Sequence, residues 1–285
     1  MNGILNVYKP PGASSAQIVG KVKHILKTRA VGHMGTLDPM GEGVLLMGVG
    51  KGTRLFDYFL SKTKTYEATF RFGLMTDTID VTGEVTGETT VLPTVQEINA
   101  ILPSFIGEQA QLPPLYSAKS VGGVRAYKLA RMGQTVELKP AIITINSLEL
   151  IGTITENEYL FRIDCSAGTY IRSICRDIAE KLGSLAIMTS IKRTRCGRYF
   201  SDTATVLDEV SPEKIIPLQT AIQSMPKVYA PDNLYKKIIN GVPVLLENCP
   251  NEKFALFCRE ELIGIAEYTE KGCKIKTYLK EDNNA

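Results

Sequence analysis

The sequence has few of the residues that build a metal centre. It contains two histidines and six cysteines, and no two cysteines form a C-x-x-C pair. Zinc sites need closely spaced cysteine and histidine ligands, so this spacing argues against zinc. We therefore expect no metal ion, and we expect the thiols to be reduced and mostly buried. They are Cys165, Cys175, Cys196, Cys249, Cys258 and Cys273.

Long apolar runs are also missing. No stretch approaches the ~18 apolar residues of a membrane span, and residues 1–12 contain Pro10-Pro11 instead of the apolar core of a signal peptide. We therefore expect a cytoplasmic protein with no membrane contact. With 285 residues, 44% of them hydrophobic, the chain is long enough for one large domain and one small one.

Net charge is small, but the basic residues are clustered. A net charge of +3 does not by itself indicate a nucleic-acid partner. Residues 1–37 contain no acidic residue, however, and residues 171–200 hold seven basic residues against two acidic ones. Such clusters are typical of a surface that follows phosphates, although a solvated helix face gives the same pattern. The basic residues are Lys9, Lys21, Lys23, Lys27 and Arg29, then Arg172, Arg176, Lys181, Lys192, Arg193, Arg195 and Arg198.

Hydrophobic periodicity predicts both helices and strands. Capping boxes at Ser14-Gln17 and Thr94-Glu97 mark two helix starts. The predicted helices are 15–28, 53–60 (with Leu55, Phe56, Phe59 and Leu60 inward), 94–105 and 170–183. The predicted strands are 44–49, 65–72, 142–151 and 159–165, followed in the C-terminal part by 241–246, 254–258, 262–266 and 274–278.

Strict alternation makes 65–72 the clearest of these strands. Tyr66 falls at its start on the core-facing side, where the ring can pack while the hydroxyl reaches outward. Packing alone is an equally good explanation for this tyrosine.

A glycine-rich stretch at residues 32–43 is the most unusual local pattern. Its four glycines allow backbone angles that other residues avoid, and Pro39 disfavours helical angles at Asp38. The stretch therefore presents one carboxylate, as a catalytic loop does, although a turn with a capping aspartate would look similar. The nearby Gly50-Lys51-Gly52-Thr53 is not a phosphate loop, because glycine follows its lysine where serine or threonine is needed.

Arg172 falls in the first turn of the helix that begins near Tyr170. A cation there opposes the helix dipole at a cost of up to ~1 kcal/mol. An acidic partner would compensate, and Asp38 is the candidate, because a guanidinium favours an ionised carboxylate and holds both its oxygens. Asp77 and Asp80 are interpreted as turn residues or as a weak cation site.

Four sequence blocks follow one another in an informative order. They are Tyr8-Lys9-Pro10-Pro11-Gly12, the G-H-x-G-x-L-D-P stretch from Gly32, Lys64-Thr65-Tyr66-Glu67 and Gly168-Thr169-Tyr170-Ile171-Arg172. Together they resemble the bacterial tRNA pseudouridine-55 synthases of the TruB type, over residues 3 to about 200. The resemblance implies an α+β fold, a pseudouridine-synthase catalytic domain with a central, mainly antiparallel mixed sheet. Proline punctuation between Asp208 and Pro226 suggests a catalytic domain at 1–225 and a small β domain at 226–285. The resemblance implies that this small domain is PUA-like and binds RNA.

The resemblance also implies roles for individual residues. Asp38 is implied to be the catalytic carboxylate, and Tyr66 to contact the flipped base and assist proton transfer. His33 is implied to lie against the RNA where the uridine has left. Five further residues are implied to bind the substrate. Tyr170 closes the pocket, Lys9 supports the catalytic loop with its charge within reach of a phosphate, and Asp80 approaches the active site. The other two are Arg172, the partner of Asp38, and Ile191, where the family commonly has leucine.

The implied reaction converts uridine 55 in the T loop of tRNA to pseudouridine. Breaking the bond from ribose C1′ to N1 builds positive charge on the sugar, which one carboxylate can stabilise, so no cofactor is expected. We expect a monomer with tRNA as its partner. Residues 111–120 and 125–127 interleave basic and aromatic residues, as an RNA-contacting segment needs. The family usually has lysine where this chain has Ser120, and Lys119 lies one place earlier.

Three other functions fit parts of the pattern. A relative in the same superfamily could modify another RNA. A non-catalytic RNA-binding protein would need the basic surface but neither Asp38 nor Tyr66. A glycosidase acting on small nucleosides would normally want a second carboxylate as general acid, and it has no use for an RNA-binding tail.

Overall fold

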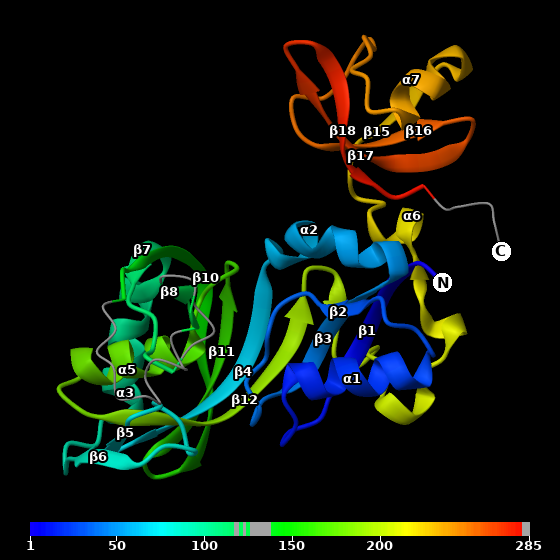
Figure 1. The fold of residues 1–285 in the computed structure, drawn as a ribbon. Helices are drawn as coiled ribbons and strands as arrows, with labels where there is room; N and C mark the ends of the chain where they lie inside the picture. The colour runs from blue at the N-terminus through cyan, green and yellow to red at the C-terminus, as the bar shows by residue number, and fades with distance from the viewer. Residues whose placement is uncertain (117–119, 122–123, 126–137, 281–285) are drawn as a thin grey trace.

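A computed structural model of the chain describes residues 1–116, 120–121, 124–125 and 138–280 (Figure 1). Lys119 and Tyr127, from the predicted RNA-contacting segment, lie outside the described residues. Up to residue 225 the elements are β1 (Gly3–Lys9), α1 (Ser15–Ile25), β2 (Val31–His33), β3 (Glu42–Val49), η1 (Gly50–Leu55), α2 (Phe56–Leu60), β4 (Lys64–Phe72), β5 (Leu74–Thr76), β6 (Val85–Glu88), α3 (Val95–Ile101), η2 (Leu102–Phe105), β7 (Gly107–Gln111), β8 (Ser120–Val121), β9 (Val124–Arg125), β10 (Ala141–Thr155), β11 (Glu158–Cys165), α5 (Ile171–Lys181), β12 (Ala186–Cys196), β13 (Tyr199–Phe200), η3 (Leu207–Glu209), η4 (Pro212–Lys214), β14 (Ile216–Pro217) and α6 (Leu218–Ala221).

Ten strands form one mixed sheet that runs through this region. The order is β14-β1-β3-β12-β4-β11-β10-β7, with β2 paired to β3 and β13 to β12. Among the described residues, the one parallel pair of strands in this sheet is short and joins the start of β3 to β12, where Glu42 lies opposite Lys192 and Gly43 opposite Arg193. The predicted mainly antiparallel α+β fold is thereby confirmed. The parallel pairing lies directly after the glycine-rich stretch, so it anchors the end of that stretch to the middle of the sheet.

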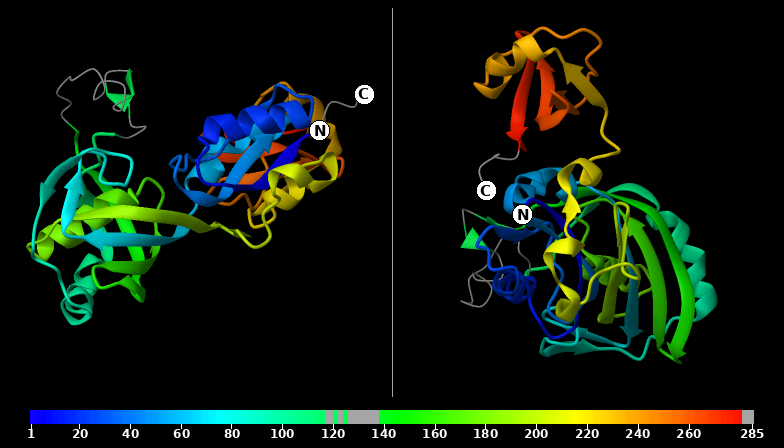
Figure 2. Two further views of the ribbon diagram at one scale, coloured as in Figure 1. Left: turned by 90° about the horizontal axis from the view of Figure 1, so that it is seen from below. Right: turned by 90° about the vertical axis from the view of Figure 1, so that its right-hand side faces the viewer.

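Helices cover the sheet in two places, and each place has its own core. α1 packs Ile18 and Val22, and Leu26 just after the helix, against one face of β1 and β3. α3 and α5 pack against β4, β10, β11 and β12 around Phe70 and Phe161. Figures 1 and 2 show the two groups of helices on separate halves of the sheet. No helix in the described part of the chain is long and apolar enough to span a membrane.

Local sequence signals account for several element ends. Both predicted capping boxes are present, with Ser14 and Thr94 as N-caps. Gly183 has a φ of +66° and follows the C-cap of α5, and the Ser184 amide donates to the Ala179 carbonyl, as in a Schellman motif. The strand predicted at 65–72 is β4, and its alternate residues from Tyr66 to Phe72 are buried.

Three predicted helices differ from the observed ones. The helix predicted at 15–28 ends at Ile25, and Lys27 adopts a left-handed φ of +47°. The helix predicted at 94–105 becomes a 3₁₀ turn at Leu102, because Pro103 has no amide to donate. The prediction that Phe56 and Leu60 face inward was wrong, since they are 41% and 37% exposed. Residues 50–55 form a 3₁₀ helix, which has three residues per turn and therefore shifts the inward-facing positions.

The C-terminal part forms a separate four-stranded sheet. Its elements are β15 (Lys227–Ala230), η5 (Asp232–Leu234), α7 (Tyr235–Ile239), β16 (Phe254–Cys258), β17 (Glu261–Thr269) and β18 (Gly272–Tyr278), with sheet order β15-β16-β17-β18. The strand predicted at 241–246 was wrong, because Pro243 cannot donate to a ladder and only Val244 bridges to Cys273. β15 was not predicted.

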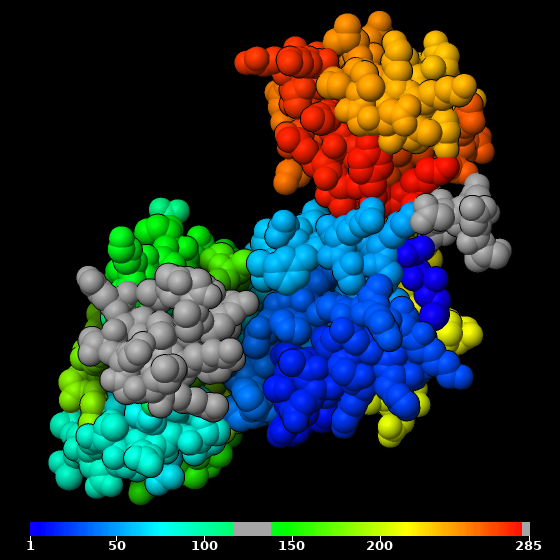
Figure 3. Space-filling model, in the orientation of Figure 1, coloured from blue at the N-terminus to red at the C-terminus, as the bar shows by residue number. Residues whose placement is uncertain are grey.

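The C-terminal sheet is not isolated from the rest of the molecule. Ala255, Phe257, Leu262 and Ile265 share one buried cluster with residues of β1, β3, α2 and α6. Figure 3 shows the C-terminal residues resting on the segment around α2. The boundary at residue 225 stays a prediction.

Candidate active site

Buried cations hold the backbone of the glycine-rich stretch from the inside. The ammonium group of Lys9 is fully buried and donates to the carbonyls of Pro10 (3.0 Å), Pro39 (3.1 Å) and Gly41. Burial lowers the pKa of Lys9 from 10.5 to about 8, although the negative charge of Asp38 opposes this shift. Lys9 therefore contacts the loop around Asp38 directly, as expected, but its charge faces carbonyls and not the surface where a phosphate would lie.

A second buried cation, Arg193 on β12, holds the other arm of the same loop. Its guanidinium donates to the carbonyls of Val44 (2.7 Å), Thr36 (3.3 Å) and Gly35 (3.2 Å). The strands approach closely at Gly43, where a Cβ would lie 2.3 Å from the Arg193 carbonyl oxygen and where φ is +100°. Glycine is therefore required at this position. The sequence placed Arg193 only in a basic cluster and gave no signal that it faces inward.

A hydroxyl from α1 fixes the residue next to Asp38. Ser15 Oγ accepts from the Leu37 amide and donates to the Leu37 carbonyl, both at 3.0 Å. The loop backbone from residue 35 to residue 41 is thus bonded from three separate elements. Because that backbone is fixed from within, the Asp38 side chain points outward and is 32% exposed.

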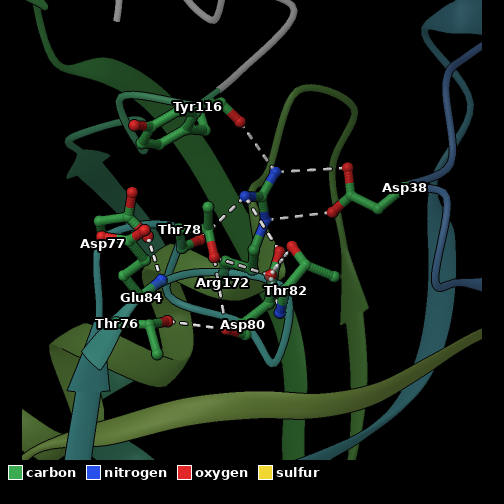
Figure 4. Close-up of polar contacts among 9 residues, drawn as sticks. All are labelled: Asp38, Thr76, Asp77, Thr78, Asp80, Thr82, Glu84, Tyr116 and Arg172. Atoms are coloured by element: carbon green, nitrogen blue, oxygen red, sulfur yellow. Dashed lines mark hydrogen bonds and ion pairs between the residues drawn. The ribbon is translucent and has the colours of Figure 1, made fainter. Parts of the chain in front are cut away.

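The predicted pairing of Asp38 with Arg172 is present (Figure 4). Arg172 Nε lies 3.1 Å from Asp38 Oδ2, and Nη2 donates to Oδ1 at 3.3 Å. Each carboxylate oxygen therefore faces its own nitrogen, which fixes the plane of the carboxylate as a single ammonium could not. Arg172 is itself buried in the first turn of α5.

Every nitrogen of the Arg172 guanidinium faces at least one oxygen atom. Besides the ion pair and the hydrogen bond to Asp38, Nη1 donates to the Thr78 carbonyl (2.9 Å) and pairs with Asp80 Oδ2 (3.3 Å), and Nη2 donates to the Tyr116 carbonyl (3.0 Å). The cost of placing a cation at a helix start is thus offset by two carboxylates. A guanidinium held at five points has almost no freedom to rotate.

Asp80 is the buried member of this network. Its Oδ1 accepts from Thr78 Oγ1 (2.8 Å), the Thr82 amide (2.9 Å) and the Thr82 hydroxyl, while Oδ2 faces Arg172. Asp80 is therefore a turn residue as well as a partner of Arg172. The preceding Ile79 has a φ of +61°, which is strained for a β-branched side chain. Asp77 accepts from the Glu84 amide and lies at the surface.

Tyr66 lies on β4 directly opposite Arg193 of β12. Burial raises the pKa of its hydroxyl to about 12, and the positive charge of Arg193 opposes this rise. The phenol is therefore protonated at neutral pH and can donate a hydrogen bond. Ile191, two residues before Arg193 and so on the same face of β12, is buried in a cluster with Tyr66 and Leu37.

His33 ends β2, just before the loop. Its Nδ1 is buried without a hydrogen-bond partner among the described residues. Burial, and then the charge of Arg193, lower the pKa of His33 below its usual value of 6.5, so the imidazole is neutral at pH 7.

Tyr170 is the N-cap of α5 and is half-buried. Its backbone is held by the side chain of Gln111 at the end of β7, a contact that the sequence did not indicate. The residues that Arg172 brings together directly are thus Asp38 and Asp80, whereas Lys9 and Arg193 support the loop behind Asp38. Tyr66 and Ile191 join this group through Arg193 and Leu37.

A metal site does not form from these groups. Among the described residues, no three His, Cys, Asp or Glu side chains gather as metal ligands do. Five of the six cysteines are buried and all six are free thiols.

Basic residues of α1 and of the segment that follows it lie at the surface. Lys21, Lys27 and Arg29 are exposed, and in the described part of the chain none of them is in an ion pair. An open hollow of about 460 Å³ at the end of α1 is lined by Lys23, His24, Lys27, Thr28 and Arg29. This surface has the charge that a phosphate backbone requires.

Solved structures with this fold include a Cbf5-Nop10-Gar1 complex, with a TM-score of 0.70 and 25% identity over 98% of this chain and 84% of that chain. An H/ACA RNP bound to a substrate RNA containing 2′-deoxyuridine has a TM-score of 0.69 at 23% identity, over 98% of this chain and 84% of that chain. These neighbours match both the large sheet and the C-terminal sheet.

Sequence relatives and a family model narrow this likeness to one class. The tRNA pseudouridine synthase B of Thermotoga maritima is 38% identical over 295 residues, covering 99% of this chain and 95% of that protein. The tRNA pseudouridine synthase B of Clostridium novyi is 36% identical over 289 residues, covering 98% of this chain and 100% of that protein. Residues 23–171 match the model described as TruB family pseudouridylate synthase (N terminal domain). The chain is therefore a pseudouridine synthase in fold and in sequence. It belongs to the TruB family, as the sequence blocks around Asp38 and Arg172 indicated.

Proposed function

We propose that this enzyme converts uridine 55 in the T loop of tRNA to pseudouridine, with Asp38 as its catalytic residue. The observation that carries the proposal is the Asp38 carboxylate, which is accessible while both its oxygens are held by Arg172. An ionised carboxylate with a fixed orientation suits a reaction that develops positive charge on a sugar.

The reaction breaks and remakes one bond to the ribose. The bond between C1′ and N1 breaks, the uracil turns, and C5 bonds to C1′. The proton leaves C5 and N1 is protonated, so the product is an isomer of the substrate. The Asp38 carboxylate faces C1′ and stabilises the charge that appears there. No electron acceptor or transferred group is needed, so no cofactor is required.

Asp80 is unsuited to be a second acid. Both its oxygens are engaged, one with Arg172 and the other with Thr78 and Thr82. Hydrolysis of small nucleosides normally uses a second carboxylate to protonate the leaving group. The single accessible carboxylate of this network thus favours isomerisation over hydrolysis.

The neighbours of Asp38 suit a base that has left its stack. Tyr66 offers an aromatic ring, on which a base recovers ~1–3 kcal/mol of the unstacking cost. Its protonated hydroxyl can donate to a uracil oxygen. Tyr170 and Ile191 complete the walls of the nucleotide pocket, and the neutral His33 lies against the RNA at the vacated position.

The remaining parts of the molecule bind the rest of the tRNA. The exposed basic residues Lys21, Lys27 and Arg29 follow phosphates, and residues 226–285 form a PUA-like RNA-binding domain. The enzyme works as a cytoplasmic monomer. The substrate is then an RNA whose T loop reaches Asp38 while the rest of the RNA backbone lies on these surfaces.

Tritium release from tRNA labelled at uridine C5 tests the proposal, since the C5 proton leaves once per turnover. We expect Asp38→Asn to abolish release while tRNA binding stays within about threefold of the parent. The matched control is Asp77→Asn, which changes a surface aspartate and should leave both unchanged. A parent protein that releases tritium equally from tRNA with cytidine at position 55 would disprove the assigned nucleotide. Turnover by Asp38→Asn would remove Asp38 from the mechanism.

A further inference from the structure

Gln111 is a buried polar residue whose side chain serves one neighbour. It ends β7, where its backbone pairs with Ala141, and the residue is only 3% exposed. Its Oε1 accepts from the Tyr170 amide at 2.8 Å, and its Nε2 donates to the Tyr170 carbonyl at 3.1 Å. One side-chain amide therefore bonds both backbone groups of Tyr170, as a neighbouring strand would.

This contact acts at the point where the chain enters α5. Tyr170 is the N-cap of that helix and has no side-chain capping bond of its own. Gly168, two residues earlier, has a φ of +84°, so the backbone turns sharply just before Tyr170. Among the described residues, three hydrogen bonds reach the backbone of Tyr170. The Ile174 amide donates the first bond of α5 to its carbonyl, and the other two bonds come from the Gln111 side chain.

The residues after Gln111 are fastened to the same helix. Ser173 Oγ donates to the Leu112 carbonyl at 2.8 Å, and Arg176 donates to that carbonyl at 3.1 Å. Arg172, which holds Asp38, donates to the Tyr116 carbonyl at 3.0 Å. Residues 111–116 and the first two turns of α5 therefore form one hydrogen-bonded unit, and Gln111 closes its first end.

We propose that Gln111 is a positioning residue for the isomerisation. Its amide sets the place of Tyr170 in the nucleotide pocket and, two residues further along, the approach of the Arg172 guanidinium to Asp38. The inference rests on the proposed function, because it takes Asp38 and Tyr170 as parts of the uridine site. Gln111 itself touches neither the sugar nor the base.

The first test removes the amide while keeping its volume. We expect Gln111→Met to lower kcat for tritium release roughly 10- to 100-fold, since a displacement of about 1 Å at a reacting centre costs up to about 100-fold. Affinity for tRNA should stay within about threefold. The matched control is Gln109→Met on the same strand, whose side-chain amide donates to the Phe105 carbonyl and not to Tyr170. It should change neither quantity by more than about twofold.

The second test distinguishes positioning from general support of the fold. An ionised carboxylate from Gln111→Glu accepts from the Tyr170 amide but cannot donate to its carbonyl, whereas a protonated carboxyl group does both. Burial raises the pKa of a carboxyl group, so this variant should regain activity relative to the parent as pH falls from about 8 to about 5. The ratio for Gln111→Met should not change with pH.

Hydrogen exchange of the Tyr170 amide is a readout that does not depend on turnover. Exchange should be faster in Gln111→Met than in the parent and unchanged in Gln109→Met. Parental kcat in Gln111→Met, equal losses of kcat and tRNA affinity, or a Gln111→Glu ratio that is flat with pH would each overturn the inference. If the parent protein shows no turnover, the proposed function is refuted instead. Even then, parental exchange of the Tyr170 amide in Gln111→Met would refute the claim that Gln111 holds the Tyr170 backbone.

Discussion

Replacing Arg172 by lysine removes the geometry of the site while keeping its charge. The guanidinium makes five contacts, two of them to Asp38, from a buried position. An ammonium group has three donors on one nitrogen and cannot face both oxygens of a carboxylate at once. In Arg172→Lys, Asp38 therefore keeps a positive neighbour but loses its fixed orientation, and buried Asp80 competes for the same cation.

The size of the effect follows from the bonds lost. A hydrogen bond to a charged group contributes about 1.5–3 kcal/mol, and Asp38 loses at least one of its two contacts with the guanidinium. Weaker orientation by the remaining ammonium brings the total to about 3 kcal/mol, which corresponds to about 100-fold in kcat. Affinity for tRNA should fall by less than about threefold, because Arg172 is buried and faces carboxylates and carbonyls.

Single-turnover tritium release and tRNA binding measure the two quantities separately. Arg162→Lys is the control, because Arg162 on β11 is exposed and pairs with Glu67 on the neighbouring strand. It should leave kcat within about threefold of the parent. Equal losses of activity and tRNA affinity in Arg172→Lys would refute the reasoning and would make Arg172 an RNA contact.

Three further predictions concern the support of the loop and of α1. The pKa of Lys9 is about 8 in the folded protein and 10.5 without burial, so the unfolded chain binds more protons between these values. In urea unfolding, the free energy of unfolding of the parent should therefore rise with pH across that window relative to that of Lys9→Met. The kcat of the parent should fall above about pH 8, because the neutral amine has one N–H donor fewer for the loop carbonyls. Gly43→Ala should destabilise the fold and reduce turnover, because its Cβ would meet backbone 2.3 Å away, whereas Gly20→Ala in open space on α1 should stabilise by ~0.5–1 kcal/mol. Lys27→Gly, at a φ of +47°, should raise the unfolding free energy by ~0.5–1 kcal/mol, while Lys23→Gly inside the helix should lower it by about as much. Changes of the same sign in the two variants would contradict the helix end at Ile25.

Local patterns predicted the elements whose cause is local. Alternation identified β4, and the capping boxes identified the starts of α1 and α3, because each of these signals lies within a few residues of its effect. The same reasoning failed at 241–246, where apolar residues suggested a strand but Pro243 could not join a ladder. Burial of Leu55 and Phe59 without Phe56 and Leu60 depended on a 3₁₀ turn that hydrophobic spacing does not reveal.

The active site was predicted in part, for the same physical reason. A cation at a helix start needs a compensating charge, and this local conflict led to the pairing of Arg172 with Asp38. No comparable conflict marked Arg193 or Gln111. Their partners lie about 150 and 59 positions away in the chain, so only the folded sheet brings them together.

The buried cluster shared by the two sheets makes the tail a structural part of the enzyme. Phe257 and Leu262 belong to the same buried cluster as residues of β1 and β3 on the side opposite α1, and β3 leads directly out of the loop that carries Asp38. A chain shortened to residue 225 would expose the apolar residues of this cluster next to the strands that carry the catalytic loop. Removing the C-terminal part to measure its contribution to tRNA affinity would therefore also destabilise the catalytic part. Single charge substitutions on the outer surface of the C-terminal part separate tRNA binding from catalysis more clearly.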